Sequence, residues 1–134
     1  MIFLRERKFV LVRREWCEEA HIGLAKTIYD AEGERLLIEG VKAGRMVLWR
    51  VNDHSWAVTE ARGGMLFLWC YQGEGLTRFI KEMRHVAKSS GFEQLSFFTR
   101  HRAAIRMLKC FKPIALPTLV AGEVQYILDV SGAL

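Results

Sequence analysis

Residues 65–88 read MLFLWCYQGEGLTRFIKEMRHVAK, and this stretch decides the fold. Its first part, 65–71, is a continuous apolar run, which is typical of a strand buried on both faces of a sheet. From Leu76 onward the apolar residues recur at intervals of three and four, as one face of an amphipathic helix requires. A strand followed by a helix and a further strand at 94–99 predicts a parallel pair joined by a right-handed crossover.

Two glycines, Gly73 and Gly75, lie at the turn between this strand and this helix. Glycine adopts positive φ and lets another group approach the backbone closely. The first turn of the following helix presents free N–H groups and the positive end of the helix dipole. These features suit an anion such as a pyrophosphate, although Glu74 between the glycines counts against one. A tight turn without a ligand is the alternative.

The rest of the chain is a continuous series of short strands and helices, without a repeat or a linker. Strands are predicted where β-forming residues cluster between turns, at 9–12, 46–51, 55–61, 65–71, 94–99, 116–121 and 124–130. Helices are predicted where apolar residues recur at helical spacing, at 15–29, 34–43, 76–88 and 102–111. The three strands from 46 to 71 form an antiparallel meander. The predicted order is β α α β β β α β α β β, an α/β fold with a mixed sheet.

Length and composition predict one globular domain spanning residues 1–134. The chain is 51% hydrophobic and 26% charged, so it can bury a single core of ordinary size. No apolar run approaches the ~20 residues that a bilayer requires, and the charged N-terminus does not resemble a signal peptide. The three cysteines are scattered, without metal-site spacing, so we expect reduced packing residues and no metal centre. The expected compartment is the cytoplasm.

The net charge of +5 is not spread evenly. Residues 78–112 hold nine Lys and Arg against two acids, whereas residues 1–77 are balanced and residues 113–134 carry only two acids. A concentrated positive field recruits anions. Because this segment begins beside the glycine turn, a phosphorylated cofactor is the first candidate. The structural alternative is a pair of helices whose basic faces are simply solvated.

Nucleic acid is a weaker candidate for the anion. The tryptophans lie in predicted core elements and not among the arginines, at Trp16, Trp49, Trp56 and Trp69. Proteins that bind single strands interleave basic and aromatic residues so that bases can stack. That interleaving is missing from residues 78–112.

The loop sequence Gln72-x-x-Gly75-x-Thr77 resembles the Q/R-x-x-G-x-G/A signature of the GNAT superfamily of N-acetyltransferases. The predicted order of elements also resembles that superfamily's order over nearly the whole chain. The resemblance implies a GNAT-like mixed sheet with its parallel pair around a bound acetyl-CoA, whose pyrophosphate lies on this loop. The cofactor-binding residues that it implies are Trp69, Tyr71, Gln72, Gly73, Glu74, Gly75, Leu76, Thr77 and Arg78. Thr77 departs from the final Gly or Ala of the signature.

A second GNAT landmark, N-x-x-A-x-x-x-Y-x-x-x-G-F, is only partly matched. Ala104 matches it, and His101 stands in the Asn position. Leu108 stands where the family often has the Tyr that protonates the departing thiolate. The resemblance thus implies a CoA-binding half without the usual general acid. Short acetyltransferase-like proteins of tailed phages are loosely similar, so the alternative function is a non-catalytic binding or virion-associated protein.

Acyl transfer needs a deprotonated amine, a thioester held against it, and donors for the carbonyl oxygen. We expect backbone N–H groups at 69–71 to be those donors. Glu60 is the candidate base, because it ends a strand on the same face as Trp56. His101 and Tyr71 are candidate acids. Each has a plainer explanation: a solvated carboxylate, a surface histidine and a packing tyrosine. The sequence does not identify the amine acceptor, small molecule or protein.

Overall fold

The computed structural model describes residues 9–25, 31–99, 106, 111, 114–117 and 124–130. The strands are β1 (Leu11–Arg14), β2 (Met46–Val51), β3 (Ser55–Arg62), β4 (Met65–Gln72), β5 (Gln94–Thr99), β6 (Ile114–Pro117) and β7 (Val124–Asp129). The helices are α1 (Glu18–Leu24), α2 (Ala31–Lys42) and α3 (Leu76–Ser89). The seven strands form one sheet in the order β1-β2-β3-β4-β5-β7-β6.

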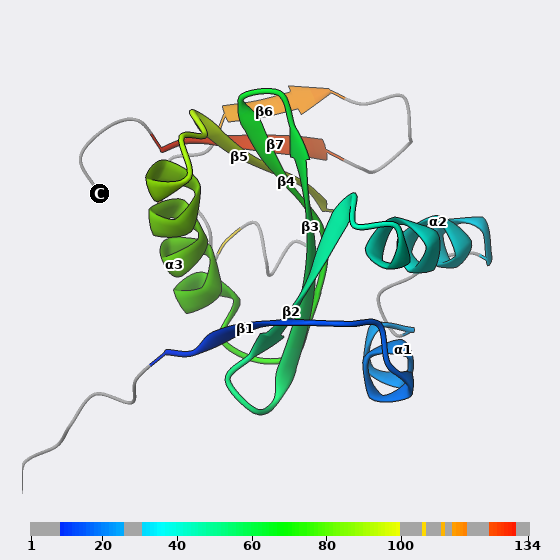
Figure 1. Ribbon diagram of the computed structural model, residues 1–134. Helices are drawn as coiled ribbons and strands as arrows, with labels where there is room; N and C mark the ends of the chain where they lie inside the picture. The colour runs from blue at the N-terminus through cyan, green and yellow to red at the C-terminus, as the bar shows by residue number, and fades with distance from the viewer. Residues whose placement is uncertain are drawn as a thin grey trace, which may run out of the picture.

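The predicted mixed sheet is confirmed. Strands β1 to β4 pair in antiparallel fashion, β4 pairs with β5 in parallel, and β5, β7 and β6 are again antiparallel. Helix α3 makes the crossover between the two parallel strands. The sheet is covered on both faces, with α3 on one side and α1 and α2 on the other (Figure 1).

Each face of the sheet has its own core. The α3-side core consists of Trp49, Val51, Ala57, Leu66, Leu68, Phe79, Ile80, Met83, Ala87, Leu95, Phe97, Leu128 and Val130. The α1/α2-side core consists of Ala20, Leu24, Leu37, Met46, Leu48, Trp56 and Val58. Cys17 and Cys70 pack against the second core, as expected of packing residues. Burial on both faces explains the continuous apolar run in β4.

The first strand differs from its prediction at 9–12. Strand β1 runs from Leu11 to Arg14, because Asn52 turns the partner strand away with φ 55°. Val10 is still held there: its N–H donates to Asn52 Oδ1 at 2.9 Å, and its carbonyl accepts from Asn52 N at 2.7 Å. These side-chain and backbone bonds replace a regular ladder at that position.

Both early helices also differ from the prediction. Helix α1 begins at Glu18, not at residue 15, and the predicted stretch 26–29 lies outside the described residues. Helix α2 begins at Ala31, inside the break that we predicted at 30–33.

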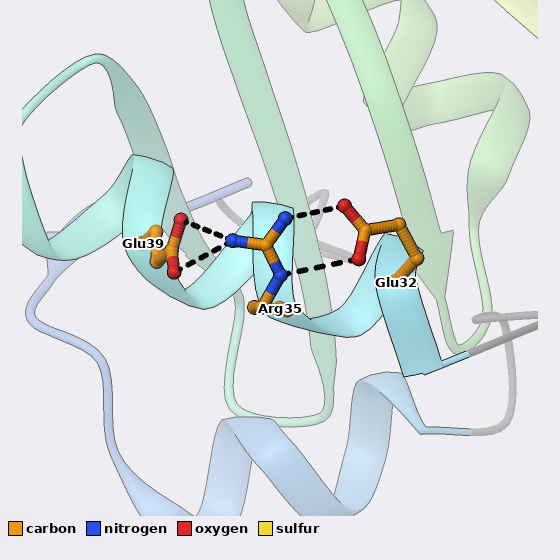
Figure 2. Close-up of polar contacts among 3 residues, drawn as sticks. All are labelled: Glu32, Arg35 and Glu39. Atoms are coloured by element: carbon orange, nitrogen blue, oxygen red, sulfur yellow. Dashed lines mark hydrogen bonds and ion pairs between the residues drawn. The ribbon is translucent and has the colours of Figure 1, made fainter.

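The first turn of α2 is favoured by its charges. Acidic side chains there complement the helix dipole. Arg35 lies between Glu32 and Glu39, as Figure 2 shows, and its Nη1 is 2.9 Å from Glu39 Oε1. The hydrogen bonds that Arg35 donates to these two carboxylates raise the pKa of its guanidinium. The triad is exposed, so it supports the helix only modestly.

The C-terminal hairpin is shifted relative to its prediction. Strand β6 is described at Ile114–Pro117, so it begins two residues before the predicted 116–121, of which 118–121 lie outside the described residues; Ile114 pairs with Ile127. Two β-branched residues placed opposite each other favour this register. The predicted turn around Gly122 lies outside the described residues, as does most of the helix predicted at 102–111. Phe111 is described, and it packs against the α3-side core as predicted.

Candidate functional site

Strands β4 and β5 part at the middle of the sheet. Their parallel ladder runs from Met65 opposite Gln94 to Leu68 opposite Phe97 and ends there. Strand β4 continues to Gln72, so its last residues lie beyond the ladder with β5. This is the segment whose backbone was expected to face an acyl group.

A β-bulge lies at the point where the ladder ends. Thr59 of β3 pairs with Leu68, but the preceding Val58 pairs with Cys70, so Trp69 is an extra residue in β4. The bulge reverses the alternation of side chains beyond it. Trp69 and Cys70 both pack on the α1/α2 side, and Tyr71 packs on the α3 side. The sequence alone gave no sign of this reversal.

Tyr71 reaches the loop that follows its own strand. Its ring lies 4.8 Å from the ring of Phe79 in α3, and its hydroxyl donates to the carbonyl oxygen of Glu74. Burial raises the pKa of the Tyr71 phenol, opposed by a hydrogen bond from Ser55 and reinforced by the charge of Glu74. The hydroxyl therefore stays protonated at neutral pH. It can act as a donor, and here its acceptor is the loop.

The glycine loop has the conformation that the sequence predicts. Gly73 has φ 122° and Gly75 has φ 77°, and Gly75 is the N-cap of α3. A Cβ on Gly73 would lie 1.9 Å from Ser55 Oγ, so the loop backbone rests directly on β3. Only glycine fits this combination of positive φ and close approach.

Ser55 is a residue that sequence reasoning missed. It is fully buried, its Oγ accepts the Glu74 N–H at 3.1 Å, and it lies 2.5 Å from His54 Nδ1. A serine after a turn is too common to attract notice. The contact with Gly73 is visible only once β3 and β4 are paired.

The first turn of α3 suits an anion. The Phe79 N–H donates to the carbonyl of the N-cap residue Gly75 at 2.9 Å. No side chain caps this helix, and its first turn holds no acidic residue. The leading N–H groups, at Leu76, Thr77 and Arg78, thus lack intrahelical partners. Glu74 is exposed. Its side chain is therefore not packed inside the loop.

The other loop residues expected to bind a cofactor are placed around this turn. Gln72 is half buried against α1, with its Oε1 3.2 Å from the position that a Cβ on Gly23 would take. Leu76 packs against the α3-side core, and Thr77 is half buried. Arg78 is exposed, and its Nε bonds Glu82 Oε1 at 3.1 Å. Its guanidinium is therefore engaged along the helix and not with the loop.

Glu60 lies beside the bulge and is not a solvated strand end. Its side chain is 16% exposed, and its Oε1 accepts from Arg62 Nε at 2.5 Å and from Trp69 Nε1 at 3.3 Å. The Arg62 guanidinium lies 5.2 Å from the centre of the Trp69 ring. Glu60 thus touches the bulged residue on the α1/α2 side. His101 and Leu108 lie outside the described residues.

No group of three or more His, Cys, Asp or Glu among the described residues could hold a metal ion. No helix in the described segments is long and apolar enough to cross a membrane.

No protein-family model matches the sequence, and no curated protein matches it either. Solved structures match it over almost the whole chain. A GNAT-family protein from Desulfovibrio desulfuricans, 14% identical, has a TM-score of 0.67 and covers 92% of this chain and 100% of its own. A Bacillus subtilis acetyltransferase in complex with CoA, 11% identical, has a TM-score of 0.70 and covers 91% of this chain and 99% of its own. The ribosomal-protein-S18-alanine N-acetyltransferase of Escherichia coli, 16% identical, has a TM-score of 0.68 and covers 94% of this chain and 96% of its own. The chain therefore has the GNAT fold.

Proposed function

We propose that this chain is a divergent GNAT protein that binds acetyl-CoA and transfers its acetyl group to an amine. The observation that carries the proposal is the Gly73–Gly75 turn, which leads into an uncapped helix where the parallel ladder has ended. The CoA complex of the Bacillus subtilis acetyltransferase has the same fold, which supports a CoA-type ligand here.

The residues present fit such a ligand. Backbone N–H groups at the start of α3 are donors without helical partners, and they suit a pyrophosphate. Acetyl-CoA supplies the acyl group as a thioester. Beyond the ladder with β5, the backbone at Trp69 is offset by the bulge, where an N–H can meet the thioester carbonyl.

The proton chemistry is assigned to Glu60 in this proposal. An amine is protonated at neutral pH and must lose a proton before it attacks. Glu60 is largely buried beside the bulged Trp69, on the α1/α2 side, and can take that proton directly or through one water. Tyr71 can serve as an acid only by releasing the Glu74 carbonyl. His101 is the remaining candidate acid.

Titration of the purified protein with acetyl-CoA by calorimetry tests the first part of the proposal. We expect saturable one-to-one binding. The informative variant is Gly75→Ala, with Gly91→Ala as its matched control. Both glycines have positive φ and flank α3, and a Cβ on either is at least 4.0 Å from its neighbours. The two variants share a backbone cost, but only Gly75→Ala should weaken binding.

The absence of any heat or thermal shift at saturating acetyl-CoA would contradict the proposal. Equal weakening by both glycine variants would also contradict it, because the effect would then be general. Transfer is tested by release of the free CoA thiol in the presence of a panel of amines. Binding without turnover on any amine would favour the non-catalytic alternative.

A further inference from the structure

Two side chains from neighbouring strands hold one residue of the glycine loop. The Ser55 hydroxyl of β3 accepts the Glu74 N–H at 3.1 Å, and the Tyr71 hydroxyl of β4 donates to the Glu74 carbonyl. Ser55 Oγ is also 3.4 Å from the same carbonyl oxygen. Both polar groups of the Glu74 backbone are therefore engaged on the protein side of the loop.

This arrangement sets the direction of the next donor. In a trans peptide the N–H points away from the C=O of the same unit, and the chain contains no cis peptide in its described part. Because the Glu74 carbonyl is directed toward Tyr71 and Ser55, the N–H of Gly75 is directed away from them. It therefore faces outward, next to the free N–H groups of the first turn of α3.

The position of Ser55 is fixed more tightly than that of an ordinary loop contact. It is fully buried, and its Oγ and Cβ lie 1.9 Å and 2.5 Å from the place where Gly73 would carry a Cβ. A hydroxyl has one donor and two acceptor sites. Ser55 can therefore bond Glu74 N and His54 Nδ1, at 2.5 Å, at the same time. The β2–β3 turn and the β4–α3 link lie at the same end of the sheet (Figure 1).

We propose that Ser55 is a positioning residue for the pyrophosphate of CoA. This positioning role rests on the proposed function. Together with Tyr71, Ser55 locks the Glu74–Gly75 peptide so that the Gly75 N–H joins the donors at the start of α3. Removal of the Ser55 hydroxyl lets this peptide rotate, since Gly75 tolerates both signs of φ. The loop then has one N–H group fewer that is fixed toward the pyrophosphate.

The test compares Ser55→Ala with Ser96→Ala. Ser96 is also fully buried in the sheet, and its Oγ accepts from Gln125 Nε2 at 2.9 Å. Each variant therefore loses one fully buried hydroxyl. Ser96→Ala loses the bond to Gln125, whereas Ser55→Ala loses the bonds to Glu74 N and His54 Nδ1, and only Ser55 touches the loop. CoA affinity is measured by calorimetry, and amide hydrogen exchange of Glu74 is measured by NMR without ligand. Tyr71→Phe, which keeps the ring on Phe79, is the second variant.

We expect Ser55→Ala to bind CoA about 5- to 20-fold more weakly than wild type, as loss of one oriented hydrogen bond predicts. Exchange of the Glu74 amide should be at least about tenfold faster. Tyr71→Phe should weaken CoA binding in the same direction, and Ser96→Ala should change neither measurement by more than about twofold. Should Ser55→Ala fail to fold, Tyr71→Phe with the exchange of the Glu74 amide provides the same comparison.

The outcomes separate this inference from the proposed function. A wild-type protein that does not bind CoA overturns both. A wild-type protein that binds CoA, with Ser55→Ala and Tyr71→Phe binding equally well, overturns the positioning role alone. Weaker binding with unchanged Glu74 exchange, or with the same loss in Ser96→Ala, also overturns it, because the loop would then not be the cause.

Discussion

Replacement of Gly73 by alanine should destabilise the protein far more than the same replacement at Gly63. Both glycines have positive φ, 122° and 59°. A Cβ at Gly63 meets nothing within 4 Å, whereas a Cβ at Gly73 would lie 1.9 Å from Ser55 Oγ and 3.0 Å from Ser55 Cα. Only the second site therefore adds a steric conflict with the sheet to the backbone cost.

The magnitude can be worked from these contacts. A non-glycine residue at such φ costs about 1–2 kcal/mol. Forcing an atom into a buried, close-packed site costs a further ~1–3 kcal/mol, and loss of the Glu74 N–Ser55 Oγ bond costs about 1 kcal/mol. The free energy of unfolding should thus fall by about 3–6 kcal/mol in Gly73→Ala and by about 1–2 kcal/mol in Gly63→Ala.

Urea unfolding followed by tryptophan fluorescence measures both values. The urea midpoint should fall in each variant while the slope of free energy against urea stays constant, since the surface exposed on unfolding is unchanged. Equal midpoints for the two variants would refute the reasoning, because the loop would then have room for a Cβ beside Ser55. A lower slope in Gly73→Ala would instead indicate that the native state itself had loosened.

Four further predictions follow from the described contacts. Trp49 Nε1 donates to the buried Thr59 hydroxyl at 2.9 Å, so Trp49→Phe leaves that hydroxyl without this donor and should lower the free energy of unfolding by about 1–3 kcal/mol. In urea unfolding, the double variant with Thr59→Val should recover part of the lost free energy. Arg35→Ala should leave the thermal midpoint almost unchanged at high salt, because the triad with Glu32 and Glu39 is exposed. The pKa of Tyr71 is raised above its usual 10.0, so the free energy that the protonated phenol contributes to folding is complete below pH 10 and is lost as the pH rises above 10. In urea unfolding, Tyr71→Phe should therefore lose less stability at alkaline pH than the wild type. Glu60→Gln should lower acetyl transfer by about 100-fold or more while calorimetry finds acetyl-CoA binding unchanged, and equal rates would remove Glu60 as the base.

The central part of the fold was predictable because its signals are local. The period of the apolar residues changes at Leu76, which separates a strand from a helix without any knowledge of partners. Positive φ at Gly73 and Gly75 follows from the residue type at a strand-to-helix turn, and the structure confirms both. The crossover and the parallel pair follow in turn from that order of elements.

Element ends that depend on a partner were not predictable in the same way. Strand β1 begins only at Leu11 because its partner strand ends at Val51, where Asn52, distant in sequence, starts a turn. Strand β6 is set by the register of Ile114 against Ile127. In each case the preferences of the residues themselves do not fix the boundary, so the hydrogen bonds of the neighbouring strand decide it.

The same distinction between local signals and distant contacts applies to the candidate site. The amino-acid sequence alone determined the glycine loop, the helix that it opens and the resemblance to the GNAT signature, because these are contiguous residues. Only the tertiary structure decided that the bulge at Trp69 turns Tyr71 toward α3, that Ser55 lies under Gly73, and that Glu60 bonds Trp69. These contacts join residues about ten to twenty positions apart along the chain, and a pairing shift of one residue between β3 and β4 would place every one of them on the wrong face.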